Sequence, residues 1–294
     1  MSRSDRARRI VAGAAYSGGG AVGLLGSAIG FLWAQSLIAR RRVGRPKDVP
    51  FAVDRRYDPA QPREVAEGDP TAGRSVRMVM LGDSGGAGLG AARPDDTPGV
   101  VVARGLADAT GRPVELRNLS VVGARTAGVH PQVTAALELF DGAGPDVAVI
   151  MVGANDVTHQ VPARVSVRNL TAVVGTLRES GCTVVVACCP DLGTVEPVPN
   201  PLRAIGRRLS RTLAAAQAMA TEAAGGYPVE LGALLGPEFA AEPGAYFSED
   251  RFHPSSIGYR RAAEVILPVL LRAMAVEQTW AEVVLDPTAP DFAE

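Results

Sequence analysis

Short apolar runs alternate with longer segments of helical spacing through the middle of this chain. We interpret five apolar runs as strands, at 76–81, 114–119, 147–152, 183–189 and 227–231. Helical spacing is found at 98–110, 126–139, 165–180, 202–224 and 255–276. Strands that are apolar throughout and separated by helices are typical of a parallel sheet covered on both faces. The pattern therefore predicts a three-layer α/β/α sandwich.

The N-terminal end departs from this pattern, because residues 10–39 contain no charged side chain. As one helix this segment would be about 45 Å long, which exceeds the roughly 30 Å hydrocarbon core of a bilayer. Arginines precede and follow it. We therefore expect an N-terminal transmembrane or signal-anchor helix. A cleaved secretory signal, for which Ala34-Gln35-Ser36 is a poor cleavage site, and a buried hairpin are the alternatives.

These patterns divide the chain into four regions. Residues 1–42 hold the basic N-terminus and the hydrophobic segment. Residues 43–75 are expected to be a linker, because five prolines interrupt a polar stretch without sustained periodicity. Residues 76–276 form the folded domain. Residues 277–294 form an acidic tail that we expect to lie on the surface or to be disordered.

The formal net charge of −1 is unevenly distributed. Residues 1–47 carry nine Arg and Lys side chains against one Asp, so the rest of the chain is acidic, with a net charge of −9. A mildly acidic body argues against nucleic-acid binding, which requires a basic face. The basic end is better explained as the flanks of the hydrophobic segment. Because both flanks are basic, the positive-inside rule gives no orientation.

All three cysteines, Cys182, Cys188 and Cys189, fall in or beside one apolar run. Neighbours on one strand have the wrong geometry for an ordinary disulfide. Three histidines in the whole chain do not complete a convincing zinc site with them. We expect buried, free thiols.

Candidate chemistry follows the strands, because ligands of open parallel sheets bind beyond the carboxyl ends of the strands. After the first strand comes Gly-Asp-Ser, with Ser84 followed by glycines that permit a tight backbone. A helix beginning near Ser84 would direct free N–H groups at the site. A serine at this turn is a candidate nucleophile, although a helix-capping serine has the same appearance.

Two later strand ends carry possible donors for an oxyanion. Gly123 follows the second strand and could present an unobstructed N–H group. Asn155 follows the third strand within Gly-Ala-Asn-Asp, where its amide could supply a further hydrogen bond. A turn glycine and an Asx turn are the plain alternatives for these two positions.

A candidate base lies just before the last helical segment. Serine needs a base for attack at neutral pH, and histidine is the residue best suited to that task. Asp250 precedes His253 by three positions, so one turn of chain could hold the carboxylate beside the imidazole. His130, His159 and Arg125 are better explained as structural or surface residues.

Taken in order, these residues resemble the SGNH (GDSL) hydrolase superfamily over roughly residues 77–273. The resemblance implies that Ser84, Asp250 and His253 form the catalytic triad, and that the N–H of Ser84, Gly123 and Asn155 form the oxyanion hole. It implies a flavodoxin-like five-stranded parallel sheet of order 2-1-3-4-5, and a reaction without metal or cofactor. Gly85 stands where the family name has leucine. The stretch 153–159 is similar to exported or membrane-anchored GDSL esterases of actinobacteria.

The resemblance implies a serine esterase that cleaves acyl esters of small molecules, lipids or glycans. An acyltransferase acting on a sugar or other alcohol, and a non-catalytic envelope protein on the same fold, are the alternatives. Specificity is expected from the loops at 190–201 and 232–247, whose apolar residues suit an acyl chain. We expect association with the membrane through residues 10–39, with the catalytic domain outside the cell. A cytoplasmic-facing anchor and a secreted form stay open, as does the oligomeric state.

Overall fold

A single sheet organises the part of the chain that the structure describes. The computed structural model describes residues 34–38, 50, 51, 53–61 and 74–285. Its strands are β1 (Arg55–Tyr57), β2 (Val76–Gly82), β3 (Val114–Asn118), β4 (Val147–Met151), β5 (Thr183–Ala187) and β6 (Tyr227–Val229). They lie in the order β1-β3-β2-β4-β5-β6. Strands β2 to β6 are parallel, and β1 pairs antiparallel with β3.

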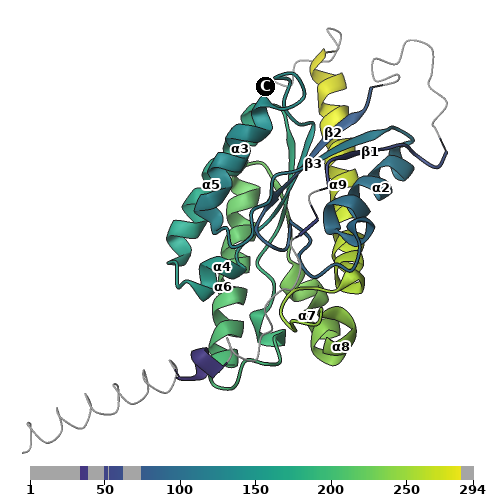
Figure 1. Cartoon of the computed structure of the whole chain (residues 1–294). Coiled ribbons are helices and arrows are strands. Elements are labelled where there is room, and N and C mark those ends of the chain that lie inside the picture. Colours follow the sequence, from purple (N-terminus) through teal and green to yellow (C-terminus); the bar gives the residue numbers. More distant parts are fainter. Residues whose placement is uncertain (1–33, 39–49, 52, 62–73, 286–294) are drawn as a thin grey trace, which may run out of the picture.

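Helices cover both faces of this sheet (Figure 1). On one face lie α2 (Pro98–Thr110) and α9 (Ser256–Leu285), and on the other lie α3 (Val129–Glu138), α5 (Ala163–Glu179) and α6 (Leu202–Ala223). Short elements gather near the carboxyl ends of the strands: η2 (Thr126–Gly128), α4 (Ala154–Thr158), η3 (Leu192–Thr194), α7 (Leu231–Ala241) and α8 (Pro243–Tyr246). A further turn, η1 (Pro94–Asp96), precedes α2.

The apolar strands supply two cores because successive side chains point to opposite faces. In β2, Met78 and Met80 pack into the core under α2 and α9, whereas Val79 and Leu81 pack into the core under α3, α5 and α6. All four side chains are fully buried. This double burial explains why the strand is apolar throughout.

The structure differs from the expected strand count and from the expected end of the last helix. The sheet has six strands and is mixed, because Arg55–Tyr57 adds an antiparallel strand from within the predicted linker. Three residues are too few to show an alternating pattern, and only Tyr57 of the three is buried. Helix α9 also continues to Leu285, past the predicted boundary at residue 276 and into the segment expected to be a tail.

The predicted anchor at residues 10–39 lies almost wholly outside the described residues. Of that segment the structure describes only residues 34–38, which are helical. The buried amide of Gln35 donates a hydrogen bond to the Asn200 carbonyl (2.6 Å) and accepts one from the Leu202 amide (3.1 Å), at the start of α6. Among the described helices, none combines the length and apolar character needed to cross a bilayer.

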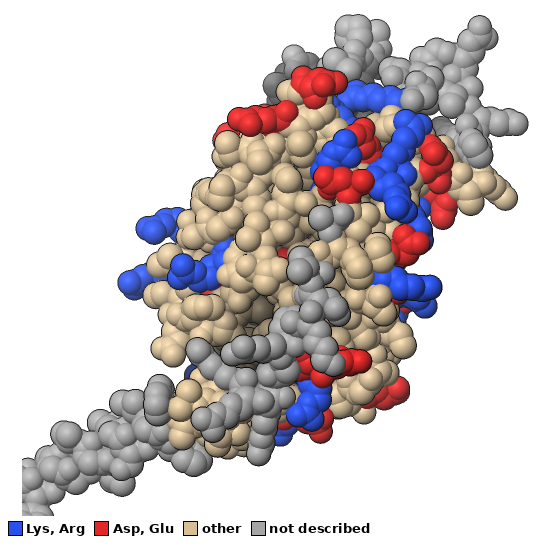
Figure 2. Space-filling model, viewed as in Figure 1, with Lys and Arg blue, Asp and Glu red and all other residues tan. Residues whose placement is uncertain are grey.

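Charged groups are unevenly spread over the surface. Figure 2 shows acidic and basic side chains intermingled over the β1 side of the molecule. Arg55 and Arg104 both pair there with Asp95 (3.9 and 3.0 Å). Nearer the middle of the same face, a hollow is bordered largely by uncharged side chains (Figure 2).

Candidate active site

The turn after β2 brings Ser84 to the carboxyl end of the sheet. Gly82 ends the strand with a φ of +130°, and a Cβ there would lie 1.9 Å from the carbonyl oxygen of Met151. Only glycine therefore lets β2 pass this close to the end of β4. The amide of Asp83 then donates to the same Met151 carbonyl (3.0 Å), which fixes the direction in which the chain leaves the strand.

The helix expected to begin near Ser84 is absent from this described segment, and the prediction is wrong. Residues 84–90 form successive turns, and the next α-helix, α2, begins only at Pro98. Gly88 and Gly90 have φ values of +75° and +97°, which are incompatible with a helix. The Ser84 carbonyl accepts a hydrogen bond from Leu89 (3.0 Å), so the turns close back on the serine.

Ser84, His253 and Asp250 are brought together in one chain of hydrogen bonds. His253 Nε2 lies 3.0 Å from Ser84 Oγ, although the two residues are 169 positions apart. His253 Nδ1 lies 2.6 Å from Asp250 Oδ2. Ser84 is 8% exposed, so its hydroxyl is shielded from most of the solvent while it remains on the wall of a cavity.

Asp250 is held as a carboxylate by its surroundings. Its Oδ1 accepts hydrogen bonds from Ser248 Oγ (2.8 Å) and from the amides of Phe252 and His253 (both 2.9 Å). Burial acts to raise the pKa of Asp250, but these bonds and the one from the His253 ring outweigh it, and the pKa falls to about 2. The imidazole therefore faces a negative charge at neutral pH.

Asn155 sits in α4, just after β4, and its amide reaches back toward the turn that holds Asp83 and Ser84. Asn155 Nδ2 donates to Asp83 Oδ2 at 3.3 Å. Asp83 Oδ1 accepts from the Gly85 amide at 2.8 Å. Burial raises the pKa of the Asp83 carboxyl to about 6, against the opposing effects of these hydrogen bonds and of His253. Asp83 was not singled out from the sequence beyond its place in Gly-Asp-Ser.

Gly123 lies in an exposed loop that is hydrogen-bonded to the segment around Ser84. The Val121 amide donates to the Gly82 carbonyl (3.0 Å), and Asn118 Nδ2 donates to the Gly86 carbonyl (3.0 Å). Gly123 has a φ of +81°, and a Cβ added there would meet nothing within 4 Å. Its surroundings are open, as an approaching substrate oxygen would require.

A buried aspartate links the loops of Gly123 and Asn155. Asp156 Oδ2 accepts hydrogen bonds from the Thr126 amide (2.9 Å) and the Thr126 hydroxyl (3.1 Å). The Thr126 hydroxyl also contacts Ser166 Oγ of α5 at 2.9 Å. The position of one candidate oxyanion loop thus depends on the other.

Two buried glutamines secure the strand ends, and the sequence analysis missed both. Gln132 in α3 accepts from the Gly82 amide (2.7 Å) and donates to the Gly82 carbonyl (2.8 Å). Gln217 in α6 accepts from the Cys189 amide (2.7 Å) and donates to the Val152 carbonyl (3.1 Å). Gln132 could have been identified from the sequence as a polar residue on the apolar face of a helix. It lies beside Val129, Val133 and Ala136 on the buried face of α3.

The remaining candidates lie outside this arrangement. His130 is exposed and contacts Asn169 (3.2 Å), and His159 Nδ1 contacts the Asn155 carbonyl at the end of α4 (2.8 Å). Arg125 is exposed. The prediction of three buried, free cysteines is confirmed. Within the described residues, no three or more His, Cys, Asp or Glu side chains are placed to hold a metal ion.

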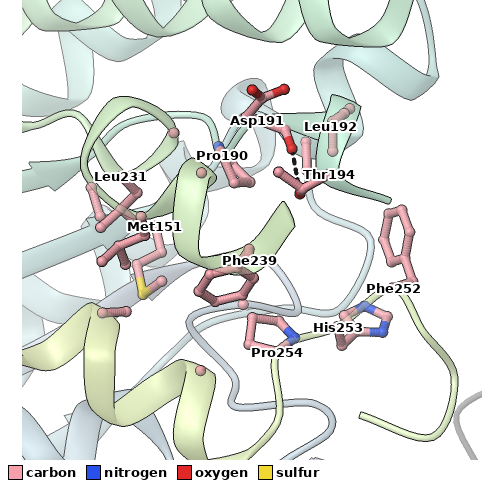
Figure 3. A pocket seen from close by; sticks show the side chains of 18 of the residues that line it. Met151, Pro190, Asp191, Leu192, Thr194, Leu231, Phe239, Phe252, His253 and Pro254 are labelled. Atoms are coloured by element: carbon pink, nitrogen blue, oxygen red, sulfur yellow. Dashed lines mark hydrogen bonds between the residues drawn. The ribbon is translucent and has the colours of Figure 1, made fainter. Parts of the chain in front are cut away.

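An apolar cavity of about 120 Å³ opens beside Ser84 and His253. Its walls come from the ends of β4 and β5, from η3, and from α7 and α9. Figure 3 shows His253 and Phe252 on one side of it and Met151 and Leu231 on the other, with Phe239 between them. The predicted specificity segments, 190–201 and 232–247, both contribute to its lining. The second of them is mainly helical and not a loop.

The sequence and the fold of this chain are similar to those of known proteins. Residues 80–261 match the sequence profile of the GDSL-like Lipase/Acylhydrolase family. The GDSL-like esterase Rv1075c of Mycobacterium tuberculosis is 44% identical over 199 residues. That match covers 68% of this chain and 63% of the relative, so the chain spans less than two thirds of the relative's length.

Two solved structures with similar folds are enzymes by their descriptions. The lipase Lip_vut3 from a goat rumen metagenome aligns with a TM-score of 0.52 and 19% identity, covering 68% of this chain and 97% of its own. A catalytic mutant of an acetylxylan esterase from Geobacillus stearothermophilus aligns with a TM-score of 0.50 and 18% identity, covering 68% and 96%. At these identities the likeness concerns the fold.

Proposed function

This chain belongs to the GDSL-like lipase/acylhydrolase family, and from that premise we propose that it hydrolyses carboxylic esters through an acyl-serine intermediate. The observation that carries the proposal is the continuous hydrogen-bond chain from Ser84 Oγ through His253 to Asp250. A serine hydroxyl needs such a base to attack at neutral pH.

In the first half of the reaction, Ser84 Oγ attacks the ester carbonyl carbon and its proton passes to His253 Nε2. The bond between that carbon and the alcohol oxygen then breaks, and His253 returns the proton to the departing alcohol. Asp250 stabilises the imidazolium that exists between these steps, and it holds the ring in the tautomer with Nδ1 protonated.

In the second half, His253 takes a proton from water, and the resulting oxygen nucleophile attacks the acyl-serine. The bond to Ser84 Oγ breaks, the serine recovers its proton from His253, and the acid leaves. The negative oxygen formed in each half is stabilised by the N–H of Ser84, the N–H of Gly123 and the amide of Asn155. Donors of this kind contribute roughly 3–4 kcal/mol each in acyl transfer.

The test is hydrolysis of p-nitrophenyl acetate, butyrate and octanoate by the full chain and by Ser84→Ala. We expect the variant to lose at least about 10³-fold in kcat/KM. Ser180→Ala, at the end of α5, is the matched control, because its hydroxyl only caps the Leu177 carbonyl and should leave activity unchanged. Full activity in Ser84→Ala, or none in the wild type with all three esters, would reject the proposal.

Product analysis separates hydrolysis from acyl transfer, since the same triad serves both. In the presence of an added sugar or other alcohol as acceptor, a hydrolase releases one free acid for each alcohol product. Accumulation of a new ester at the expense of the acid would identify a transferase.

A further inference from the structure

The apolar cavity beside Ser84 has a small volume, about 120 Å³, and we infer that it receives the acyl chain of the substrate and limits that chain to about six carbons. This inference rests on the proposed esterase function. It assigns a substrate class, short-chain to medium-chain acyl esters, to the candidate active site.

The inner part of the cavity belongs to the hydrophobic core. Met151, Ala187, Leu231, Leu235 and Ala262 line it, and all five are less than 9% exposed. They belong to the same core cluster, between the sheet and α9. In Figure 3, Met151 and Leu231 lie at the side away from His253, so the cavity runs from the catalytic histidine toward the core. A hydrocarbon chain suits such walls, and a sugar or headgroup does not.

The size of the cavity sets the length. An apolar protein cavity of about 150 Å³ holds a benzene ring, which has six carbons. The present cavity, about 120 Å³, therefore fits roughly five or six carbons. A longer acyl chain would have to displace Leu231 or Leu235, which are packed in the core.

The order of events favours the acyl group over the alcohol as the occupant. The acyl group stays covalently bound to Ser84 until water arrives, so a pocket with fixed, apolar walls suits it. The alcohol must leave before water can take its place beside His253, and an open position suits it better. Gly123, whose surroundings are open, lies in an exposed loop outside the cavity lining.

Two substitutions at the inner end should move the length limit in opposite directions. Ala262→Leu adds three carbons to the lining from α9 and should shorten the best chain to acetate or butyrate. Leu235→Ala removes three carbons from α7 and should extend it to octanoate or beyond. Leu234→Ala is the matched control, because Leu234 is the next residue of α7 but is 54% exposed and outside the lining.

The experiment measures kcat/KM of the full chain and the three variants for p-nitrophenyl esters from acetate to decanoate. In the wild type, each methylene that enters the cavity should raise kcat/KM about fourfold. The rise should stop at hexanoate. The Leu234→Ala profile should match that of the wild type. A parallel series with the acyl group fixed as butyrate and the alcohol lengthened should show no such rise and limit.

Several outcomes would overturn the inference while leaving the esterase proposal intact. One is Ser84-dependent activity whose chain-length optimum is the same in Ala262→Leu, Leu235→Ala and the wild type. Another is a dependence on alcohol length instead of acyl length. Acetate turnover reports folding, because an acetyl group does not reach the substituted positions. If Leu235→Ala does not hydrolyse the acetate ester, Ala262→Val is compared with the wild type instead. We expect its chain-length optimum to shift toward shorter chains. Activity that survives Ser84→Ala would instead reject the proposed function.

Discussion

The amide of Asn155 donates to the buried carboxylate of Asp83, 72 positions away, at the paired carboxyl ends of β4 and β2. One amide hydrogen is used in this bond, and the other is left for a substrate oxygen. Asp83 itself precedes Ser84 directly and lies close enough to His253 for the charge of that imidazole to lower the pKa of Asp83. Asp83 is therefore placed to orient Asn155 and to favour the imidazolium.

Asn155→Ala should lower kcat by about 10²-fold with little change in KM, because an oxyanion donor acts in the transition state. Asp83→Asn keeps the shape but removes the charge, so we expect a smaller loss, of about tenfold, again mainly in kcat. Steady-state kinetics on a butyrate ester checks both. An effect of either variant confined to KM would contradict the assigned roles.

Asp83 should make the fold less stable as pH rises. Its pKa is raised to about 6 in the fold, against an ordinary value of 3.8, so the native state holds a proton that the unfolded chain has lost between about pH 4 and 6. The cost is absent below this window and full above it, on the order of 3 kcal/mol. Urea unfolding should therefore show Asp83→Asn gaining stability relative to wild type between pH 4 and pH 8. An unchanged difference over that range would contradict the prediction.

Asp250 should have the opposite effect. Its pKa is lowered to about 2, so its contribution to stability is present above about pH 4 and is lost as pH falls toward 2. We expect Asp250→Asn to be less stable than wild type at pH 7, on the order of 1–2 kcal/mol, and the difference to shrink below pH 4. Chemical unfolding at pH 7 and pH 3 measures it. A difference that grows on acidification would be inconsistent with this account.

Gly153 should tolerate no side chain. Its φ is +136°, and a Cβ would lie 2.8 Å from the Cβ of Cys189. Gly153→Ala should lower the free energy of unfolding by about 2–4 kcal/mol and displace Asn155, two residues on. Gly175→Ala in α5 is the control, since a Cβ there meets nothing within 4 Å and alanine favours the helix by about 1 kcal/mol. Similar melting temperatures for the two variants would contradict the prediction.

The full chain should remain with membranes after carbonate extraction if residues 10–39 form the predicted anchor. A chain that begins at Ala34 keeps the Gln35 contacts to the start of α6, and it should be released into the soluble fraction. Immunoblotting of pellet and supernatant distinguishes the two. Release of the intact full chain would reject a membrane-spanning segment.

Periodic features of this fold could be predicted from the sequence, and isolated contacts could not. The strands β2 to β5 and the long helices α2, α5 and α6 repeat an apolar pattern over at least five residues each, so an exception at one position does not hide the pattern. Strand β1 and the helices α4 and α7 have no such repeat. Helix α7 contains Pro237 and two glycines, which are more typical of a loop.

In the candidate site, too, some residues could be located from the sequence and others could not. Ser84, Gly123, Asn155, Asp250 and His253 follow strands or precede a helix at positions where ligands usually bind, so their approximate placement followed from topology. Gln132, Gln217 and Asp156 act through backbone groups that are distant in sequence. The backbone groups that these side chains bond are known only from the folded structure, because no sequence spacing relates each side chain to its partner.

The short strand β1 has a practical consequence for solubility. It satisfies the outward-facing backbone groups of β3 through pairs such as Arg55 with Leu116. A fragment that began at Arg74 would include every candidate catalytic residue, yet β3 would become a bare border strand with unpaired N–H and C=O groups. Such a strand is a template for pairing with another molecule. Residues 55–57 thus cover an edge of the sheet through which a shortened protein would be expected to associate with itself.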